Sequence, residues 1–372
     1  MKKALILLLL VGMVAPVFAD DAKVLPQGVA RIRVIPVLGI TTGSYDDSGD
    51  KTDNEDNAAD QLPDEGIWAL GGALEYGVTN QISLGLRWTP VYQFMADADA
   101  TGTDAYDVQT GGLEQADLGA EIQILGEQGY LPNDMMRFSV TPGVGIPMPV
   151  TADWAAEGKN VINQSDFIAP TSLNTTEAQL GLLLNFDYII NEMFEVNLFT
   201  EGRYRFARTR DVKDFYNGMV EEAASLSDAY SSYDIEYGPN LFWETGIEPK
   251  ASFQASDAIR LDAGLTTKFT LNTARDVTTT ATLSNATAQG TVSSILSSNS
   301  SLGNLGLSSS DIDRTVDGDT SYIMRFEPSV GAFITALPVP LEVTAQYSIP
   351  LLGQNEVASQ RLITQLRAYV RF

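Results

Sequence analysis

Hydrophobic and polar residues alternate along most of this chain, and this period of two constrains the fold more than any other feature. From Ile259 onward, Ile259, Leu261 and Leu265 fall on one face of an extended strand, whereas Arg260 and Asp262 fall on the other. We count about twelve such segments, at 28–42, 66–77, 82–93, 112–125, 137–148, 176–190, 195–207, 239–253, 258–272, 320–335, 341–352 and 359–372.

The connections between these segments fall into two alternating classes. The short ones are 78–81, 126–136, 191–194, 254–257 and 336–340, and the long polar ones are 43–65, 94–111, 151–175, 208–238 and 273–319. A membrane barrel sorts its connections in this way because periplasmic turns are short and external loops are long. We therefore predict an all-β fold, a single transmembrane antiparallel up-and-down β-barrel over 28–372, with about twelve strands and fourteen possible.

The beginning of the chain indicates export. Residues 1–19 read MKKALILLLLVGMVAPVFA, with two lysines, a short apolar run and small residues at the end, which is typical of a cleaved secretory signal peptide. Residues 20–27 then form a short periplasmic segment before the first strand. The final strand ends in Phe372, an outward aromatic residue that we expect the barrel-assembly machinery to recognise. We therefore expect the protein in the cell outer membrane.

The two faces of the predicted strands differ in charge. The apolar face is expected to contact outer-membrane lipid, and the polar face to line the lumen, where acids and bases are about equally frequent. In a soluble core so many buried charges would each cost several kcal/mol. The candidate lumen residues are Arg31, Arg33, Arg87, Glu121, Glu201, Arg203, Arg205, Glu244, Arg260, Lys268, Arg325 and Arg367.

Composition excludes several functions. The chain contains no histidine and no cysteine, which removes Ser-His-Asp, Cys-His and His-zinc chemistry, and we expect neither an enzyme nor a cofactor. A formal charge of −25 argues against nucleic acid as a partner. The acidic loop 43–65 lacks the spacing of a helix–loop–helix calcium site, so we expect a solvated acidic run and no metal site.

Two long loops contain apolar residues at helical spacing. One helix is expected within 211–230 and a weaker one within 290–307, with Phe215, Met219, Leu226, Ile295 and Leu296 as the candidate apolar residues. These helices could form an apolar landing groove above the barrel mouth, or they could pack on each other as a lid. The Ser/Thr/Ala-rich segment 276–310 is expected to be mobile.

Prolines interrupt several predicted strands. Pro142, Pro147 and Pro149 lie in the sequence TPGVGIPMP, and each removes one hydrogen bond from a strand ladder. They could open a side exit from the lumen to the membrane, or they could simply curve the strand.

Four segments resemble a known group of proteins. LPQG before the first strand, LEYGVTNQISLGLRW at 74–88, LEQADLGAEIQIL at 113–125 and FSVTPGVGIPMP at 138–149 resemble the outer-membrane proteins related to FadL-type long-chain fatty-acid transporters and meta-pathway aromatic-compound channels. The resemblance implies passive uptake of small hydrophobic ligands. Those transporters carry an N-terminal plug of several dozen residues, which the short segment 20–27 cannot provide, so no binding residue is carried over.

Three functions fit these features. The first is an outer-membrane channel for small, mainly hydrophobic compounds, which the apolar loop helices and the strand prolines favour. The second is a general diffusion porin, favoured by the charged lumen. The third is a structural or adhesive surface barrel acting through its acidic loops. None of the patterns predicts an oligomeric state.

Overall fold

The computed structural model describes residues 22–53, 66–90, 92–95, 113–148, 152–163, 177–304 and 306–372. The predicted signal peptide 1–19, Pro149 and most of the expected loops 43–65, 94–111 and 151–175 lie outside the described residues.

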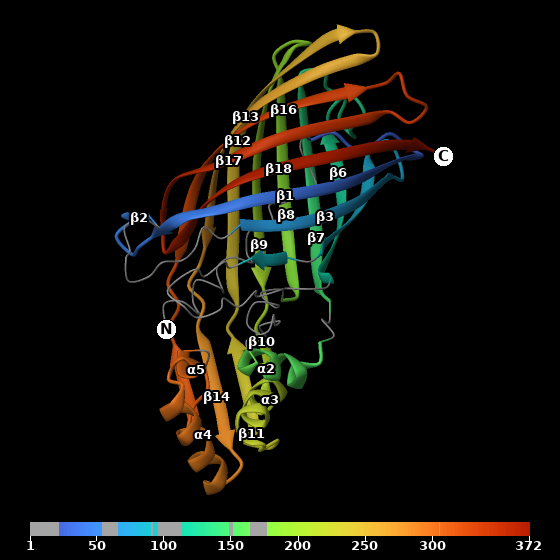
Figure 1. Cartoon of the computed structure of the whole chain (residues 1–372). Helices are drawn as coiled ribbons and strands as arrows, with labels where there is room; N and C mark the ends of the chain where they lie inside the picture. The colour runs from blue at the N-terminus through green and yellow to red at the C-terminus, as the bar shows by residue number, and fades with distance from the viewer. Residues whose placement is uncertain are drawn as a thin grey trace.

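Twelve antiparallel strands close into a barrel, which confirms the fold predicted from the sequence (Figure 1). Each strand pairs with its neighbour in the chain, and pairing of β1 with both β18 and β3 closes the cylinder. The strands are β1 (Val29–Tyr45), β3 (Gly66–Gly77), β4 (Ile82–Pro90), β6 (Leu113–Leu125), β7 (Met136–Pro147), β8 (Gln179–Ile189), β9 (Phe194–Arg205), β12 (Asn240–Ser256), β13 (Ile259–Asn272), β16 (Ser321–Ile334), β17 (Leu341–Gln354) and β18 (Glu356–Arg371).

The barrel is inverted relative to a soluble protein. Outward leucines such as Leu38 and Leu265 are 51% and 42% exposed, whereas the inward Arg33 is fully buried. Strand alternation produces this pattern, because successive side chains point to opposite faces of the sheet. An apolar outer belt around a charged interior is the arrangement expected of a barrel surrounded by lipid.

Two short strands extend the barrel sheet. β2 (Lys51–Asp53) pairs with β1, and β5 (Tyr92–Met95) pairs with β3. The sequence pattern predicts one strand over 82–93, but the pairing register shifts between Thr89 and Pro90, and β5 begins as a separate strand. Proline explains the break because it has no N–H to donate to the ladder.

A second sheet projects from the long-loop end of the barrel (Figure 1). It consists of β10 (Arg208–Asp211), β11 (Tyr230–Tyr237), β14 (Val277–Leu283) and β15 (Ile312–Val316). With it lie α2 (Trp154–Ile162), α3 (Lys213–Ala224), α4 (Ala286–Ser298) and α5 (Ser301–Asn304), and we call these eight elements the loop unit. Within the described part of the chain, no helix is long and apolar enough to cross a membrane.

The loop unit has its own hydrophobic core. Phe215, Met219 and Ile295 are buried in it, and Leu226 and Leu296 pack against it partly buried. The helix candidates of the sequence therefore face a common core with the second sheet. The segment 276–310, expected to be mobile, instead contains β14, α4 and α5. Its threonine run forms a strand because β-branched residues fit a pleated sheet.

Glycines let two helices of this unit approach closely. A Cβ on Gly158 of α2 would lie 2.0 Å from the carbonyl oxygen of Phe215, and one on Gly218 of α3 would lie 2.1 Å from that of Ala155. Neither distance is possible for a real side chain, so the packing of α2 on α3 requires glycine at both positions.

Candidate functional site: the barrel lumen

The lumen contains a cavity of about 690 Å³ toward the end of the barrel that carries the short turns. Its lining includes Asn191 of the β8–β9 turn, Ser252 near the end of β12, and Tyr369 near the end of β18. Both described chain ends lie at this end of the barrel, since the amide of Phe372 donates to the carbonyl of Gly28 at 2.8 Å. We call this cavity the vestibule.

The N-terminal segment lies inside the vestibule. The amide of Ala22 donates to Asp187 at 3.0 Å and the amide of Leu25 donates to Ser83 at 2.8 Å, and Val24 and Leu25 line the cavity. Gly77 makes room for the chain, because a Cβ there would lie 2.2 Å from the carbonyl oxygen of Pro26. This insertion was not predicted from the sequence, in which residues 20–27 are too short to form an N-terminal plug of several dozen residues.

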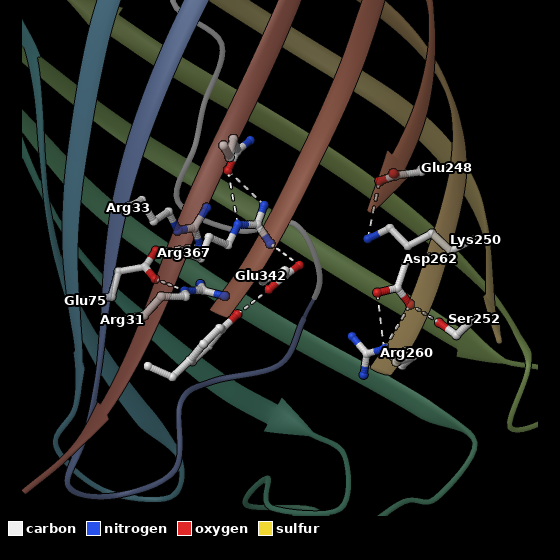
Figure 2. A network of polar contacts seen from close by, with 12 residues as sticks. Arg31, Arg33, Glu75, Glu248, Lys250, Ser252, Arg260, Asp262, Glu342 and Arg367 are labelled. Carbon is white, nitrogen blue, oxygen red and sulfur yellow. Dashed lines mark hydrogen bonds and ion pairs between the residues drawn. The ribbon is translucent and has the colours of Figure 1, made fainter. Parts of the chain in front are cut away.

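One group of charged side chains lies on β1, β3, β17 and β18 (Figure 2). Glu75 accepts hydrogen bonds from both Arg31 and Arg33, the latter at 2.8 Å, and Arg367 donates to Glu342 at 2.9 Å. These partners lie on neighbouring strands with side chains on the same face, where cross-strand charges of opposite sign stabilise the sheet. The group therefore links β1 to β3 and β17 to β18, on the two sides of the barrel closure.

A second group lies on β12 and β13 (Figure 2). Lys250 lies 3.3 Å from Glu248, and Arg260 lies 2.9 Å from Asp262, which also accepts from Ser252 at 2.6 Å. Each ion pair joins residues two apart in one strand, which share a face. The Arg260 side chain is 44% exposed, so this group lies in the wetter part of the lumen.

Farther from the turns, one lysine is shared by two carboxylates. The ammonium of Lys268 lies 3.6 Å from Glu244 and 3.3 Å from Glu327, and all three side chains are at most 8% exposed. The residues come from β12, β13 and β16, which are adjacent in the barrel. They form the loop-side part of the vestibule lining.

The other candidate lumen residues extend this pairing toward the long loops. Arg87 is paired with Asp117, and Arg203 donates to Glu201 at 2.5 Å. Glu121 accepts a hydrogen bond from Ser139 at 2.9 Å, and Arg325 donates to the carbonyl of Ser359 at 2.8 Å. The guanidinium of Arg205 lies over the Phe242 ring, 5.1 Å from its centroid. All twelve candidates thus lie on barrel strands with their polar groups among inward side chains.

The lumen also has an apolar patch that was not predicted from the sequence. Val24, Leu25, Leu183 and Phe199 all line the vestibule. The ring of Phe199 lies over Gly246, where a Cβ would be 2.5 Å from its Cζ. The alternation of side chains along a strand could have predicted that Leu183 and Phe199 point into the lumen. Leu183, for example, lies four residues before the inward Asp187 on β8 and therefore shares its face.

The strand prolines differ in their surroundings. Pro142 pairs with Leu182 of β8 in unbroken register, but toward β6 the pairing is interrupted between Gly143 and Val140. Pro147 is the last residue of β7, and its neighbour Pro149 lies outside the described residues. The ladder between β6 and β7 is therefore weakened opposite Pro142 while the barrel wall keeps its strand order.

The structure defines a closed antiparallel β-barrel with an apolar outer face and a charged lumen. No known protein family matches the sequence, and no curated protein is similar to it in sequence. In structure, the chain is similar to an outer membrane channel from Pseudomonas putida F1, with a TM-score of 0.53, 15% identity, and coverage of 95% of this chain and 100% of that chain. At that identity the similarity shows the fold alone.

Two further solved structures are more distant. The toluene transporter TbuX of Ralstonia pickettii has a TM-score of 0.37 and 9% identity, covering 94% of this chain and 90% of that chain. A FadL homologue of Pseudomonas aeruginosa has a TM-score of 0.34 and 10% identity, covering 92% and 90%. These scores are too low to support an argument about this chain.

Proposed function

We propose that the protein is an outer-membrane channel for the passive uptake of small, mainly hydrophobic compounds. The observation that carries the proposal is the vestibule, in which Val24, Leu25, Leu183 and Phe199 supply an apolar surface beside fixed charges. Sites for small molecules combine apolar surface with polar groups that orient the ligand, and the vestibule, whose lining is largely polar, provides both. The structurally similar P. putida protein is an outer membrane channel, which supports this role.

The membrane location belongs to the same proposal. The exposed leucines of the outer belt would contact outer-membrane lipid, and the predicted signal peptide would direct export. Phe372 is 84% exposed and follows the last residue of β18, where the barrel-assembly machinery could bind it.

The exit of the solute is part of the proposal as well. A compound could leave through the vestibule to the periplasm, or it could pass sideways where the β6–β7 ladder is interrupted opposite Pro142. Replacing Pro142 with valine would restore an amide donor at this position. Slower uptake of an apolar compound by Pro142→Val, with normal folding, would favour the lateral route; unchanged uptake would favour the vestibule.

Uptake by whole cells tests the function itself. A Gram-negative host that lacks such channels would be compared with and without the protein, using radiolabelled toluene and a long-chain fatty acid. The proposal predicts faster entry of at least one compound in cells that make the protein. Equal rates for both compounds in both strains would contradict it.

A general diffusion pore is the second candidate. The charged side chains of the vestibule wall, with both signs present, would suit small polar solutes. Planar-bilayer recordings distinguish this candidate, because a general pore gives a steady ionic conductance with all loops intact. Absence of conductance together with uptake of apolar compounds would exclude the pore and leave the first proposal standing.

A further inference from the structure

Glycines occupy one row of the inner wall across four adjacent strands. Gly85 of β4 pairs with Gly119 of β6, Gly119 pairs with Gly143 of β7, and Gly143 pairs with Gly181 of β8. Each glycine has the parity of the inward residues of its strand, as Thr141 shows on β7. The wall is therefore free of side chains along this row.

A recess of about 40 Å³ lies against the row, at Gly119, Gly143 and Gly181. A Cβ on Gly119 or Gly143 would meet within 4 Å only atoms of β6 and β7 themselves, such as the Leu118 carbonyl oxygen at 3.1 Å from the Gly143 position. The opposite wall of the barrel does not reach these two glycines. The recess is therefore a small concavity in the inner wall at positions where glycines carry no side chain.

Three buried polar atoms around the recess have no hydrogen-bond partner among the described residues. They are Oγ1 of Thr141, Oε1 of Gln179 and Oε2 of Glu201. Their residues are at most 7% exposed. A buried oxygen without a partner is destabilising, so such a group normally holds a water or a ligand.

These three oxygen atoms favour a ligand group that is neutral and can donate a hydrogen bond. The amide and carboxylate oxygens can only accept, and the threonine hydroxyl can do both. Oε1 of Glu201 already accepts from Arg203 at 2.5 Å, so its charge is compensated without a further cation. A hydroxyl group fits such a set, because it can donate to an acceptor and accept from threonine.

Leu183 connects the recess to the vestibule. Its side chain lines both, and in the sheet it is paired with Thr141 on one side and Glu201 on the other. The recess has room for a few atoms of water size, whereas a ring must remain in the vestibule beside Leu183 and Phe199. A solute with an apolar body and one polar end would occupy both spaces at once.

We infer that the recess is the head-group subsite of the channel, and that it takes the hydroxyl of a small phenol or alcohol whose apolar body lies in the vestibule. This inference rests on the proposed function and adds the substrate class. Water would occupy the recess when no solute is bound.

The test compares 4-tert-butylphenol with its methyl ether, which has the same body but no hydrogen-bond donor. Uptake of both radiolabelled compounds is measured in cells that make the wild type, Thr141→Val or Gly181→Ala. The first variant removes one orphaned oxygen at constant shape. The second places a methyl group in the recess, where its nearest neighbour is Arg203 Cγ at 3.4 Å, an ordinary contact. Thr267→Val, a lipid-facing threonine of β13, is the matched control.

We expect the wild type and Thr267→Val to take up the phenol about fivefold faster than the ether, which corresponds to one net hydrogen bond. Thr141→Val and Gly181→Ala should lose most of this preference while the ether rate stays the same. Equal uptake of both compounds by the wild type would overturn the inference and leave the channel intact. A preference that both variants retain would also overturn it. Rates no higher than in cells without the protein would contradict the proposed function itself.

Discussion

The ammonium of Lys268 lies 3.3 Å from the carboxylate of Glu327 on the neighbouring strand, with both side chains at most 8% exposed. Glu244 approaches the same ammonium at 3.6 Å. Lys268 therefore bridges two buried carboxylates at the loop-side end of the vestibule. Such an arrangement makes the lysine more important for stability than the exposed ion pairs of the same lumen.

Replacing Lys268 with methionine should destabilise the barrel by about 3 kcal/mol, because it removes the ammonium that bridges two buried carboxylates. Lys250→Met is the matched control, since Lys250 and Glu248 are both 17% exposed and such a pair contributes about 1 kcal/mol or less. Urea unfolding in detergent micelles measures both changes. Equal losses for the two variants would show that burial of the Lys268 cluster has no special role.

An arginine on the lipid face should be costly at the middle of a strand. Leu265 is 42% exposed near the centre of β13, and Leu265→Arg should destabilise the inserted barrel by about 2–4 kcal/mol. Asp257→Arg, in the turn before β13, serves as the control with little expected effect. Equilibrium folding into phospholipid vesicles gives both values, and a similar small change for the two variants would contradict the outward orientation of Leu265.

The alternating pattern of the sequence was sufficient to predict the barrel but not the fold of the loop unit. Alternation along segments such as 258–272 located the barrel strands, because each strand has one apolar face on the outside of the barrel and one polar face in the lumen. The short strands β10 and β14 carry no comparable signal. β10 (RTRD) has no apolar residue, and the apolar residues of β14 pack into the core of the loop unit with segments that are distant in the sequence. Helical spacing located α3, but only the fold shows that Met219 faces a core shared with β11.

The contents of the lumen were predictable only in part. Parity identified inward charges such as Arg33 and Glu201. Their partners depend on register between strands, which is not visible in the sequence. The insertion of residues 22–27 uses hydrogen bonds to Asp187 and Ser83 and the space left by Gly77, and none of these partners is visible in the sequence.

Displacing the N-terminal segment should open the vestibule. Gly77→Ala places a Cβ 2.2 Å from the Pro26 carbonyl oxygen, so residues 22–27 must move away from β3. Single-channel conductance in planar bilayers should rise as a result. Gly202→Ala is the matched control, because a Cβ there has nothing within 4 Å. Identical conductance for both variants would mean that the segment does not limit the passage.

The core of the loop unit should unfold separately from the barrel. Met219 is completely buried, and Met219→Ala should cost the unit about 2–5 kcal/mol through the cavity it leaves. Limited proteolysis should then cut near α3, while the heat-modifiable mobility of the barrel on gels stays normal. Glu222→Ala, on the exposed side of α3, should leave the unit resistant. Loss of the barrel mobility in Met219→Ala would show that the two parts fold as one.

High pH should loosen the loop unit. Burial raises the pKa of both Tyr216 and Tyr230 to about 12, from an ordinary value of 10.0. The folded unit therefore retains protons that the unfolded chain has lost, so the contribution of these two tyrosines to its stability is constant below pH 10 and falls as the pH rises toward 12. Absorbance at 295 nm should show these tyrosines ionising later in the folded protein than in denaturant. Coincident titration curves would contradict their burial.

Passage of solute through the lumen is tested most directly with adjacent single-cysteine variants, because the natural chain has no cysteine. Leu183 faces the vestibule with 5% exposure, whereas Leu182 faces lipid with 46%. Uptake of radiolabelled 4-tert-butylphenol is measured before and after complete modification with a bulky thiol reagent in outer-membrane vesicles. A lumen pathway predicts that modified Leu183→Cys loses uptake while modified Leu182→Cys keeps it. Unchanged uptake by fully modified Leu183→Cys would contradict the pathway.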